Sequence, residues 1–502
     1  MRDEEVCGDA ICGSSNRIGG SVRVRNRELT RDRSVLPFTT PLGRPSVETL
    51  MPGPSGLESR PLTSVEELVA YFASAGKPRA DWRLGIEQEK IGVTDFGACV
   101  RFTGPQGIET LLRQIVDDGY SGSYEGTQIL GANRDGIHVT VEPGGQLEFS
   151  GPTLHTAEDC RRLLYEHVRE VSRLGDALGV RFLGVGFQPW AAMDEIEWLP
   201  KRRYGVMRDY LPTRGLLGLQ RMKMTATVQA NLDYLDEESA SKKMRTAFGV
   251  TSIVTAMFAA SSISDGAPNG YKSRRAAIWL DTDNSRCGLL PESFQRACSD
   301  GVGFRHYAEW ALDVPMFFVV RDGIYHSANG MTFRRFMAEG WRDQRATMED
   351  WETHLSTLFP EVRLKTYIEL RGADAGPMDM ASALGALWRG LLDDSDACAA
   401  AWALVRSATY GDRQELRQNV PRLGLAAKMV GYPLSTLARE LVEIAASGLA
   451  RLPGGVADAA LLEPLRAYAL AGRAPADDML DDFANNAGDP AGLVKRWTLK
   501  AA

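Results

Sequence analysis

The chain has 502 residues, of which 44% are hydrophobic and 25% are charged, which is typical of a globular protein with a large core. The formal net charge of -7 is mild and favours solubility, so we expect no nucleic-acid partner, which would require a concentrated basic surface. The most apolar run, at about 248–263, is interrupted by hydroxyl side chains and is too short to span a bilayer comfortably, so we expect no membrane segment.

Seven cysteines are scattered along the chain without a Cys-x-x-Cys pair. This usage predicts a reducing cytoplasm and argues against a zinc site. The first twenty residues carry acids early and have no apolar core, so they do not resemble a secretory signal peptide. We therefore expect a cytoplasmic protein.

Residues 1–60 are rich in Arg, Ser, Gly and Pro and show no sustained hydrophobic period, which predicts a mobile N-terminal extension. Predicted order begins at Ser64, where Ser64 and Glu67 have the spacing of a capping box. Residues 61–502 are expected to form a single domain that is strand-rich to about 377 and helical from about 378.

Hydrophobic periodicity predicts the elements of this domain. In chain order they are a helix from Ser64, strands over 82–93, 138–143 and 144–151, a helix over 156–178, strands over 181–187 and 224–234, a helix over 237–263, a strand or turn over 276–283, a hairpin over 314–326 around Asp322-Gly323, a strand over 363–374, and helices from 378 to about 470. Strands grouped early and helices grouped late predict an α+β fold with a mainly antiparallel sheet.

Acidic residues recur inside the predicted strands, where Asp and Glu are ordinarily depleted. Glu87 and Glu89 lie two residues apart and so point to one face, and Glu369 and Arg371 have the same spacing. A further strand carries Glu148. Carboxylates on one face repel unless a cation neutralises them, and oxygen ligands without soft ligands indicate Mg²⁺ or Mn²⁺.

An arginine next to such a metal would meet an anion, and a site for both a metal and an anion suits phosphoryl transfer. The alternative that stays open is a set of acids on the solvent face of an antiparallel sheet. The sequence has neither the Walker A spacing nor a complete dinucleotide-binding glycine motif, so ATP, if it binds, binds in another architecture.

Ordered blocks of sequence resemble the plant-type glutamate–cysteine ligase family, which also occurs in bacteria. These blocks include WRLGIEQEKIGV, VEPGGQLEFSG, TATVQANLDY, WLDTDNSRCGLLP and RLKTYIELRGAD, and the resemblance covers roughly residues 60–475. It implies a glutamine-synthetase-like catalytic core in which a mainly antiparallel sheet, surrounded by helices, lines the active site. We expect a monomer or homodimer.

The resemblance also implies a reaction. ATP would phosphorylate the side-chain carboxylate of glutamate, and the amine of cysteine would then displace phosphate. The product would be γ-glutamylcysteine, the first intermediate of glutathione biosynthesis. The same chemistry could instead feed ergothioneine synthesis or use another amine. The third hypothesis is a non-catalytic relative that binds glutamate or nucleotide. The presence of Glu87, Glu89, Glu148, Glu369 and Arg371 argues against it.

Residue roles follow from the matched motifs. The resemblance implies that Mg²⁺, or possibly Mn²⁺, is held by Glu87, Glu89, Glu148 and Glu369, with Glu142 as a weaker candidate. It implies that the substrates are bound by Arg208, Thr225, Arg275, Trp279 and Arg371, of which Arg275 and Arg371 would also take part in catalysis. Lys365 is the expected contact to the ATP phosphates.

The chain departs from the plant pattern at two places. Met224 stands where the plant proteins carry an arginine, and the adjacent Lys223 offers charge without the planar fork of a guanidinium, so the contacts to the second substrate are left open. Cys160 lies near one cysteine of the plant redox switch, whereas Ser382 stands at the other position. We therefore predict no such disulfide control.

Overall fold

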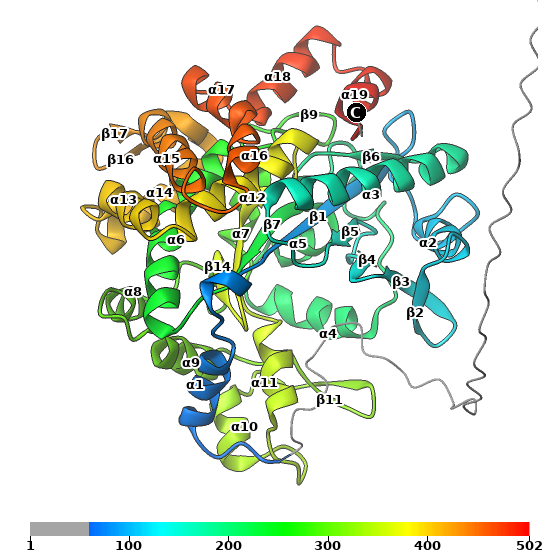
Figure 1. Ribbon diagram of the computed structural model, residues 1–502. Coiled ribbons are helices and arrows are strands. Elements are labelled where there is room, and N and C mark those ends of the chain that lie inside the picture. Colours follow the sequence, from blue (N-terminus) through cyan, green and yellow to red (C-terminus); the bar gives the residue numbers. More distant parts are fainter. Residues whose placement is uncertain (1–59, 501–502) are drawn as a thin grey trace, which may run out of the picture. The chain divides into compact units, whose positions relative to one another are not determined.

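The computed structural model describes residues 60–500, which belong to one compact unit (Figure 1). The predicted N-terminal extension lies outside the described residues, and the predicted division of the chain at about residue 60 stays a prediction. Within residues 60–500, no helix has the length and apolar character needed to cross a membrane.

The centre of the fold is a nine-stranded sheet in which every pairing is antiparallel. In spatial order its strands are β14 (Val362–Leu364), β15 (Ile368–Asp374), β7 (Thr227–Leu232), β1 (Leu84–Val93), β5 (Leu147–Ser150), β4 (Ile137–Val141), β3 (Gln128–Arg134) and β2 (Ser121–Glu125), and β6 (Arg181–Leu183) pairs with the end of β1. The α+β class and the mainly antiparallel sheet are confirmed.

Helices surround this sheet and dominate the chain after residue 378. They are α1 (Val65–Ser74), α2 (Ile108–Asp117), α3 (Ala157–Leu178), α4 (Arg202–Tyr210), α5 (Gly218–Met224), α6 (Glu237–Met257), α7 (Arg274–Trp279), α8 (Glu292–Ser299), α9 (Gly303–Asp313), α10 (Phe333–Glu339), α11 (Met348–Leu355), α12 (Met378–Leu392), α13 (Ser395–Val405), α14 (Tyr410–Leu423), α15 (Leu434–Leu449), α16 (Gly455–Ala460), α17 (Glu463–Ala471), α18 (Pro475–Asn485) and α19 (Pro490–Trp497).

Short strand pairs complete the described residues. They are β8 (Ile263–Ser264) with β9 (Ala267–Pro268), β10 (Cys287–Gly288) with β13 (Phe359–Pro360), β11 (Phe318–Arg321) with β12 (Ile324–Ser327), and β16 (Lys428–Met429) with β17 (Tyr432–Pro433). The β11–β12 hairpin confirms the turn predicted at Asp322-Gly323, where both residues have positive φ.

One face of the sheet is covered by α3 and α12, which both pack against β1. Alternation along β1 sends Leu84 and Ile86 to this face. Helix α12 approaches closely because position 385 is glycine, where a Cβ atom would come within 2.8 Å of the Ile86 side chain. The opposite face of β1 therefore carries Glu87 and Glu89, and the fold leaves this acidic face for function.

Three predicted elements differ from the structure. Residues 276–279, expected within a strand or turn over 276–283, instead belong to helix α7 because the Ser273 hydroxyl accepts a hydrogen bond from the Ala276 N–H (3.0 Å) and caps the helix, whereas a turn follows at 280–281. The predicted strand over 363–374 is a hairpin of β14 and β15. The helix predicted over 237–263 ends at Met257.

Candidate active site

Three carboxylates lie together on the open face of the sheet, and we call Glu87, Glu89 and Glu148 the acid face. Glu89 on β1 is directly opposite Glu148 on β5. Glu87 is one strand pleat further along β1, opposite Gln229 on β7. All three side chains are half-buried. Like charges directly opposite each other in an antiparallel pair are destabilising, so this register calls for a compensating cation.

Neutral donors hold the acid face in place. The Gln229 amide donates to Glu87 (3.0 Å), and the Thr227 backbone N–H donates to Glu89 (2.9 Å). The Thr140 hydroxyl, from β4, donates to Glu148 (2.6 Å). The ion pairs found within residues 60–500 include none of these three carboxylates. The carboxylates are thus oriented by hydrogen bonds, and no direct ion pair in the described part of the chain neutralises their charge.

The pKa values reflect this shortage of positive charge. Burial, reinforced by the charges of Glu142 and Glu87, raises the pKa of Glu148 to about 8. Burial together with Glu142 and Glu148 raises the pKa of Glu89 well above its ordinary value. Burial and the charge of Glu369 raise the pKa of Glu87. A bound cation would relieve the repulsion that contributes to each shift.

The acid face meets the chemical requirements of a hard divalent cation. Its donors are oxygens, no soft ligand lies among them, and their negative charges are not paired. Within residues 60–500, no three acidic, His or Cys side chains are close enough to form a ready-made metal centre. Glu89 and Glu148, which face each other across the β1–β5 pair, are the best-placed first ligands, and the metal assignments stay predictions.

In metal-free protein, the free energy of unfolding is expected to fall as the pH rises from about 5 to about 8. Folding raises the pKa of Glu148 from 4.5 to about 8, so in this window the folded state holds a proton that the unfolded state has released. Thermal unfolding in EDTA, compared between wild type and Glu148→Gln, isolates this contribution. The variant should lose stability less steeply with rising pH, by a few degrees across the window; an equal slope in both proteins would contradict the expectation.

Glu369 lies on the same side of the sheet but in a different electrostatic environment. It is only 1% exposed and is contacted by Arg371 (2.5 Å), Arg363 (2.6 Å) and Lys365 (3.7 Å). Although burial raises its pKa, the two guanidinium groups and the ammonium group together hold the pKa of Glu369 far below the ordinary value. Glu369 is thus an ionised anchor for three cations, and its predicted role as a metal ligand stays a prediction.

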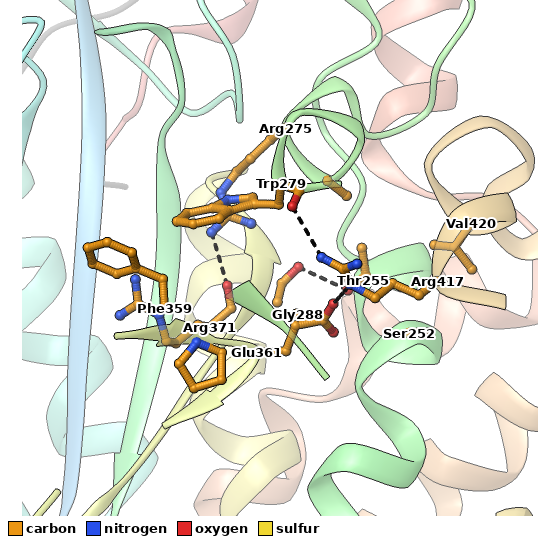
Figure 2. Close-up of a pocket in the computed structure, with 13 residues that line it drawn as sticks. Ser252, Thr255, Arg275, Trp279, Gly288, Phe359, Glu361, Arg371, Arg417 and Val420 are labelled. Carbon is orange, nitrogen blue, oxygen red and sulfur yellow. Dashed lines mark hydrogen bonds and ion pairs between the residues drawn. The ribbon is translucent and has the colours of Figure 1, made fainter. Parts of the chain in front are cut away.

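A cavity adjoins this cation cluster, with about 490 Å³ of empty space that is partly open to solvent (Figure 2). It lies where helices α6, α7 and α14 meet β13 and β15. The lining residues are Ser252, Thr255, Arg275, Ala276, Trp279, Gly288, Phe359, Pro360, Glu361, Arg371, Gly372, Arg417 and Val420. Three residues that the sequence assigned to substrate binding, Arg275, Trp279 and Arg371, are therefore brought together.

Buried polar atoms in this cavity have no partner within the protein. Arg275 donates through one Nη to the Arg371 carbonyl (3.0 Å), but its Nε has no hydrogen-bond partner. The same is true of Trp279 Nε1 and Glu361 Oε2. Buried polar atoms are ordinarily satisfied, so these atoms mark the cavity as a binding site for a polar ligand.

Arg417 connects the helical part of the chain to the cavity wall. Its guanidinium pairs with Glu361 (2.5 Å) and donates to the Trp279 carbonyl (3.2 Å), contacts that are visible in Figure 2. A Cβ atom at Gly288 would come within 2.7 Å of this guanidinium, and Gly288 also has a φ of 87°. Glycine at this position therefore leaves the space that Arg417 needs.

Other predicted site residues lie outside the cavity lining. Arg208 on α4 has a side chain that is 51% exposed and lies 3.8 Å from Asp209. Thr225 is buried at the end of α5, where its hydroxyl donates to the Arg221 carbonyl (2.7 Å). Lys365 lies in the turn between β14 and β15. The predicted roles of these three residues stay predictions.

Sequence reasoning missed several arginines, and Arg221 is the most informative. It precedes Met224 on α5, and its guanidinium packs over the rings of Trp279 (5.1 Å) and Phe359 (4.7 Å). Met224 lies in a separate apolar cluster, and Lys223 donates to the Met193 carbonyl. A charged residue in a short helix carries no sequence pattern that predicts its burial, so Arg221 could not be assigned to the site from the sequence.

The acid face, the cation cluster around Glu369 and the adjoining arginine-lined cavity together have the chemistry of a site for anionic ligands. A solved glutamate–cysteine ligase from Francisella tularensis, in complex with AMP, has a related fold, with a TM-score of 0.51 over 83% of this chain and 87% of that chain at 14% identity. That likeness establishes the fold.

Sequence comparison establishes the family. The sequence model of the glutamate-cysteine ligase family 2 (GCS2) matches residues 83–496. The chloroplastic glutamate–cysteine ligase B of Oryza sativa subsp. japonica is 39% identical over 84% of each chain, and the chloroplastic glutamate–cysteine ligase of Arabidopsis thaliana is 38% identical over 85% of this chain and 80% of its own. This chain belongs to the glutamate–cysteine ligase family and is a ligase, which confirms the resemblance found in the sequence.

Proposed function

We propose that the chain joins the γ-carboxylate of glutamate to the amine of cysteine with ATP, forming γ-glutamylcysteine for glutathione biosynthesis. The observation that carries the proposal is the position of the acid face beside a cavity that holds Arg275 and Arg371. The relatives named above are called glutamate–cysteine ligases, and the Francisella enzyme binds AMP. A site with metal-type oxygen donors on one side and guanidinium groups on the other suits transfer of a phosphoryl group to a carboxylate.

The proposed chemistry has two displacements. An oxygen of the glutamate γ-carboxylate attacks the γ-phosphorus of ATP, and ADP leaves. The cysteine nitrogen then attacks the γ-carbonyl carbon, phosphate leaves, and the nitrogen loses a proton. Phosphorylation is needed because a free carboxylate has no adequate leaving group.

The side chains have distinct parts in this proposal. Mg²⁺ bound by Glu89, Glu148 and Glu87 would supply positive charge to the reacting phosphate and carboxylate. Arg275 and Arg371 bind and orient the anionic groups of glutamate and of the transferred phosphate, and Arg275 also meets Asp374 at 3.9 Å. Glu369 fixes Arg371 at 2.5 Å, which orients that guanidinium before the substrate arrives.

The direct test is a reaction with purified full-length protein. Release of phosphate from ATP should require glutamate, cysteine and Mg²⁺ together, and mass spectrometry should identify γ-glutamylcysteine. Mn²⁺ in place of Mg²⁺ should support the same product. Freshly prepared, metal-loaded protein that forms no γ-glutamylcysteine would refute the proposed function.

Arg275→Met is expected to raise the KM for glutamate by about 10- to 100-fold, because the charged hydrogen bonds of a guanidinium to a substrate carboxylate are lost. Steady-state kinetics with saturating ATP and cysteine measure this effect. Arg274→Met is the matched control, since Arg274 contacts Gln220 (3.2 Å) and does not line the cavity. An equal change of KM in both variants would contradict the assignment.

The second candidate keeps this chemistry and changes the amine or the pathway. It is favoured by the replacement of the plant arginine by Met224, whose side chain packs in an apolar cluster with Phe187 and Ile278. Incubation with cysteine and competing amines at equal concentrations separates the two, because a preferred product other than γ-glutamylcysteine would support the second. We also propose that the chain acts in the cytoplasm as a monomer or homodimer.

A further inference from the structure

Arg221 is a buried arginine whose charge is not paired. Its side chain is 9% exposed, and its Nε and one Nη have no hydrogen-bond partner. Most other buried arginines in the described part of the chain have carboxylate partners, as in Arg286–Asp283 (2.7 Å) and Arg389–Asp458 (2.6 Å), whereas Arg413 donates to the Gln295 side chain (2.8 Å). Burial of an unpaired charge is costly, so the surroundings of Arg221 call for an anion that the protein does not itself supply.

Arg221 lies against the aromatic wall of the cavity. Trp279 and Phe359, whose ring centres are 5.9 Å apart, form one wall of the cavity. Arg221 packs on both rings and is not among the residues that line the cavity. The groups whose charges act on it include Cys287, Glu142, which follows β4 next to the acid face, and Arg371 of the cavity. Arg221 thus adds a further positive group beside the aromatic wall.

The rings of Trp279 and Phe359 hold the guanidinium in place. A guanidinium packed on aromatic faces loses little further freedom when it binds, and its free edge matches the two oxygens of a carboxylate. The unpartnered Nε and Nη form such an edge. This arrangement favours a planar carboxylate as the ligand.

We propose that Arg221 binds the carboxylate of the second substrate, the amino acid that supplies the amine. The inference rests on the proposed function, in which two amino acids each carry a carboxylate that does not react. Arg275 and Arg371 line the cavity, and Arg221 offers a further positive group, without a carboxylate partner among the described residues, on the rings of Trp279 and Phe359. This unpaired guanidinium is available for the carboxylate of the second amino acid.

The test compares cysteine with cysteamine, which has the same amine and thiol but no carboxylate. Arg221→Met should lower kcat/KM for cysteine by about 10- to 100-fold, mainly through KM, because charged hydrogen bonds to the carboxylate are lost. With cysteamine the same variant should change kcat/KM by less than about 3-fold, since wild type makes no such contact with it. Arg221→Lys should restore part of the cysteine KM because it keeps the charge.

Arg245→Met is the matched control, because Arg245 also packs on an indole ring, that of Trp402 (4.7 Å), and also has an unpartnered Nε. It should not distinguish cysteine from cysteamine. An equal loss with both acceptors in Arg221→Met would overturn the inference, as would a loss seen only in the KM for ATP. A loss that disappears when 4-aminobutyrate replaces glutamate would assign Arg221 to the donor and also overturn it. An inactive wild type would instead refute the proposed function, and the inference with it.

Discussion

Glu89→Gln is expected to lower kcat for ligation by about 100-fold or more at saturating substrates, because the site loses one of two facing carboxylates proposed to hold the metal. Glu89 and Glu148 are direct cross-strand neighbours, so a cation between them is bound by both. Glutamine keeps the size and the hydrogen bond from the Thr227 N–H but removes the charge. Phosphate release at several Mg²⁺ concentrations measures the effect, and more Mg²⁺ should be needed for half-maximal rate.

The control for this variant is Glu166→Gln, which removes an exposed carboxylate from α3 on the covered side of the sheet. It should leave kcat and the Mg²⁺ requirement unchanged. Glu148→Gln should behave like Glu89→Gln, since both remove a charge from the same pair. If Glu89→Gln kept more than about a tenth of the wild-type rate at unchanged Mg²⁺ requirement, the metal assignment of the acid face would be wrong.

The acid face could be predicted from the sequence because it depends on strand alternation alone. Two glutamates at a spacing of two on a strand must share a face, whatever the rest of the fold. The structure adds the register, which places Glu148 opposite Glu89 rather than Glu87. Register depends on contacts between distant segments, so no local pattern contains it.

Prediction of secondary structure from local sequence was wrong where a few residues decide between two conformations. Residues 276–283 are predicted to form a strand or turn, yet the Ser273 cap starts the helix Arg274–Trp279, which places Arg275 and Trp279 in the cavity lining. The single strand predicted at 363–374 is bent into a hairpin, and this bend brings Arg363 opposite Glu369. Arg363 could not be assigned to the site in advance because its partner is reached only through the turn.

The sequence pattern also did not predict which charged side chains are buried. Arg221 and Arg417 lie on helices, where a charged side chain ordinarily faces solvent. Both instead contact the walls of the cavity, Arg221 through the rings of Trp279 and Phe359 and Arg417 through Glu361. Only tertiary packing shows that these helices present their arginines inward.

Glu369→Gln is expected to destabilise the metal-free protein by about 3 kcal/mol or more, because it leaves the buried guanidinium groups of Arg363 and Arg371 without a counter-charge. Glu89→Gln should have the opposite sign in metal-free protein, since it removes repulsion with Glu148. Chemical unfolding in EDTA measures both. The contrast follows from the environments of the two acids: three cations contact Glu369, whereas neutral donors orient the acid face.

Arg363→Met provides the control for this contrast, because it removes one cation from Glu369 and leaves the facing Glu89–Glu148 pair in place, and it should also destabilise the protein. Equal signs for Glu369→Gln and Glu89→Gln would contradict the division of the site into a cation-rich and a cation-poor part. The Mg²⁺ requirement of Glu369→Gln then tests the predicted metal role separately. A Glu369 that binds metal raises the Mg²⁺ needed for half-maximal rate when it is replaced, whereas an anchor for Arg371 alone leaves this concentration unchanged and lowers the affinity for glutamate.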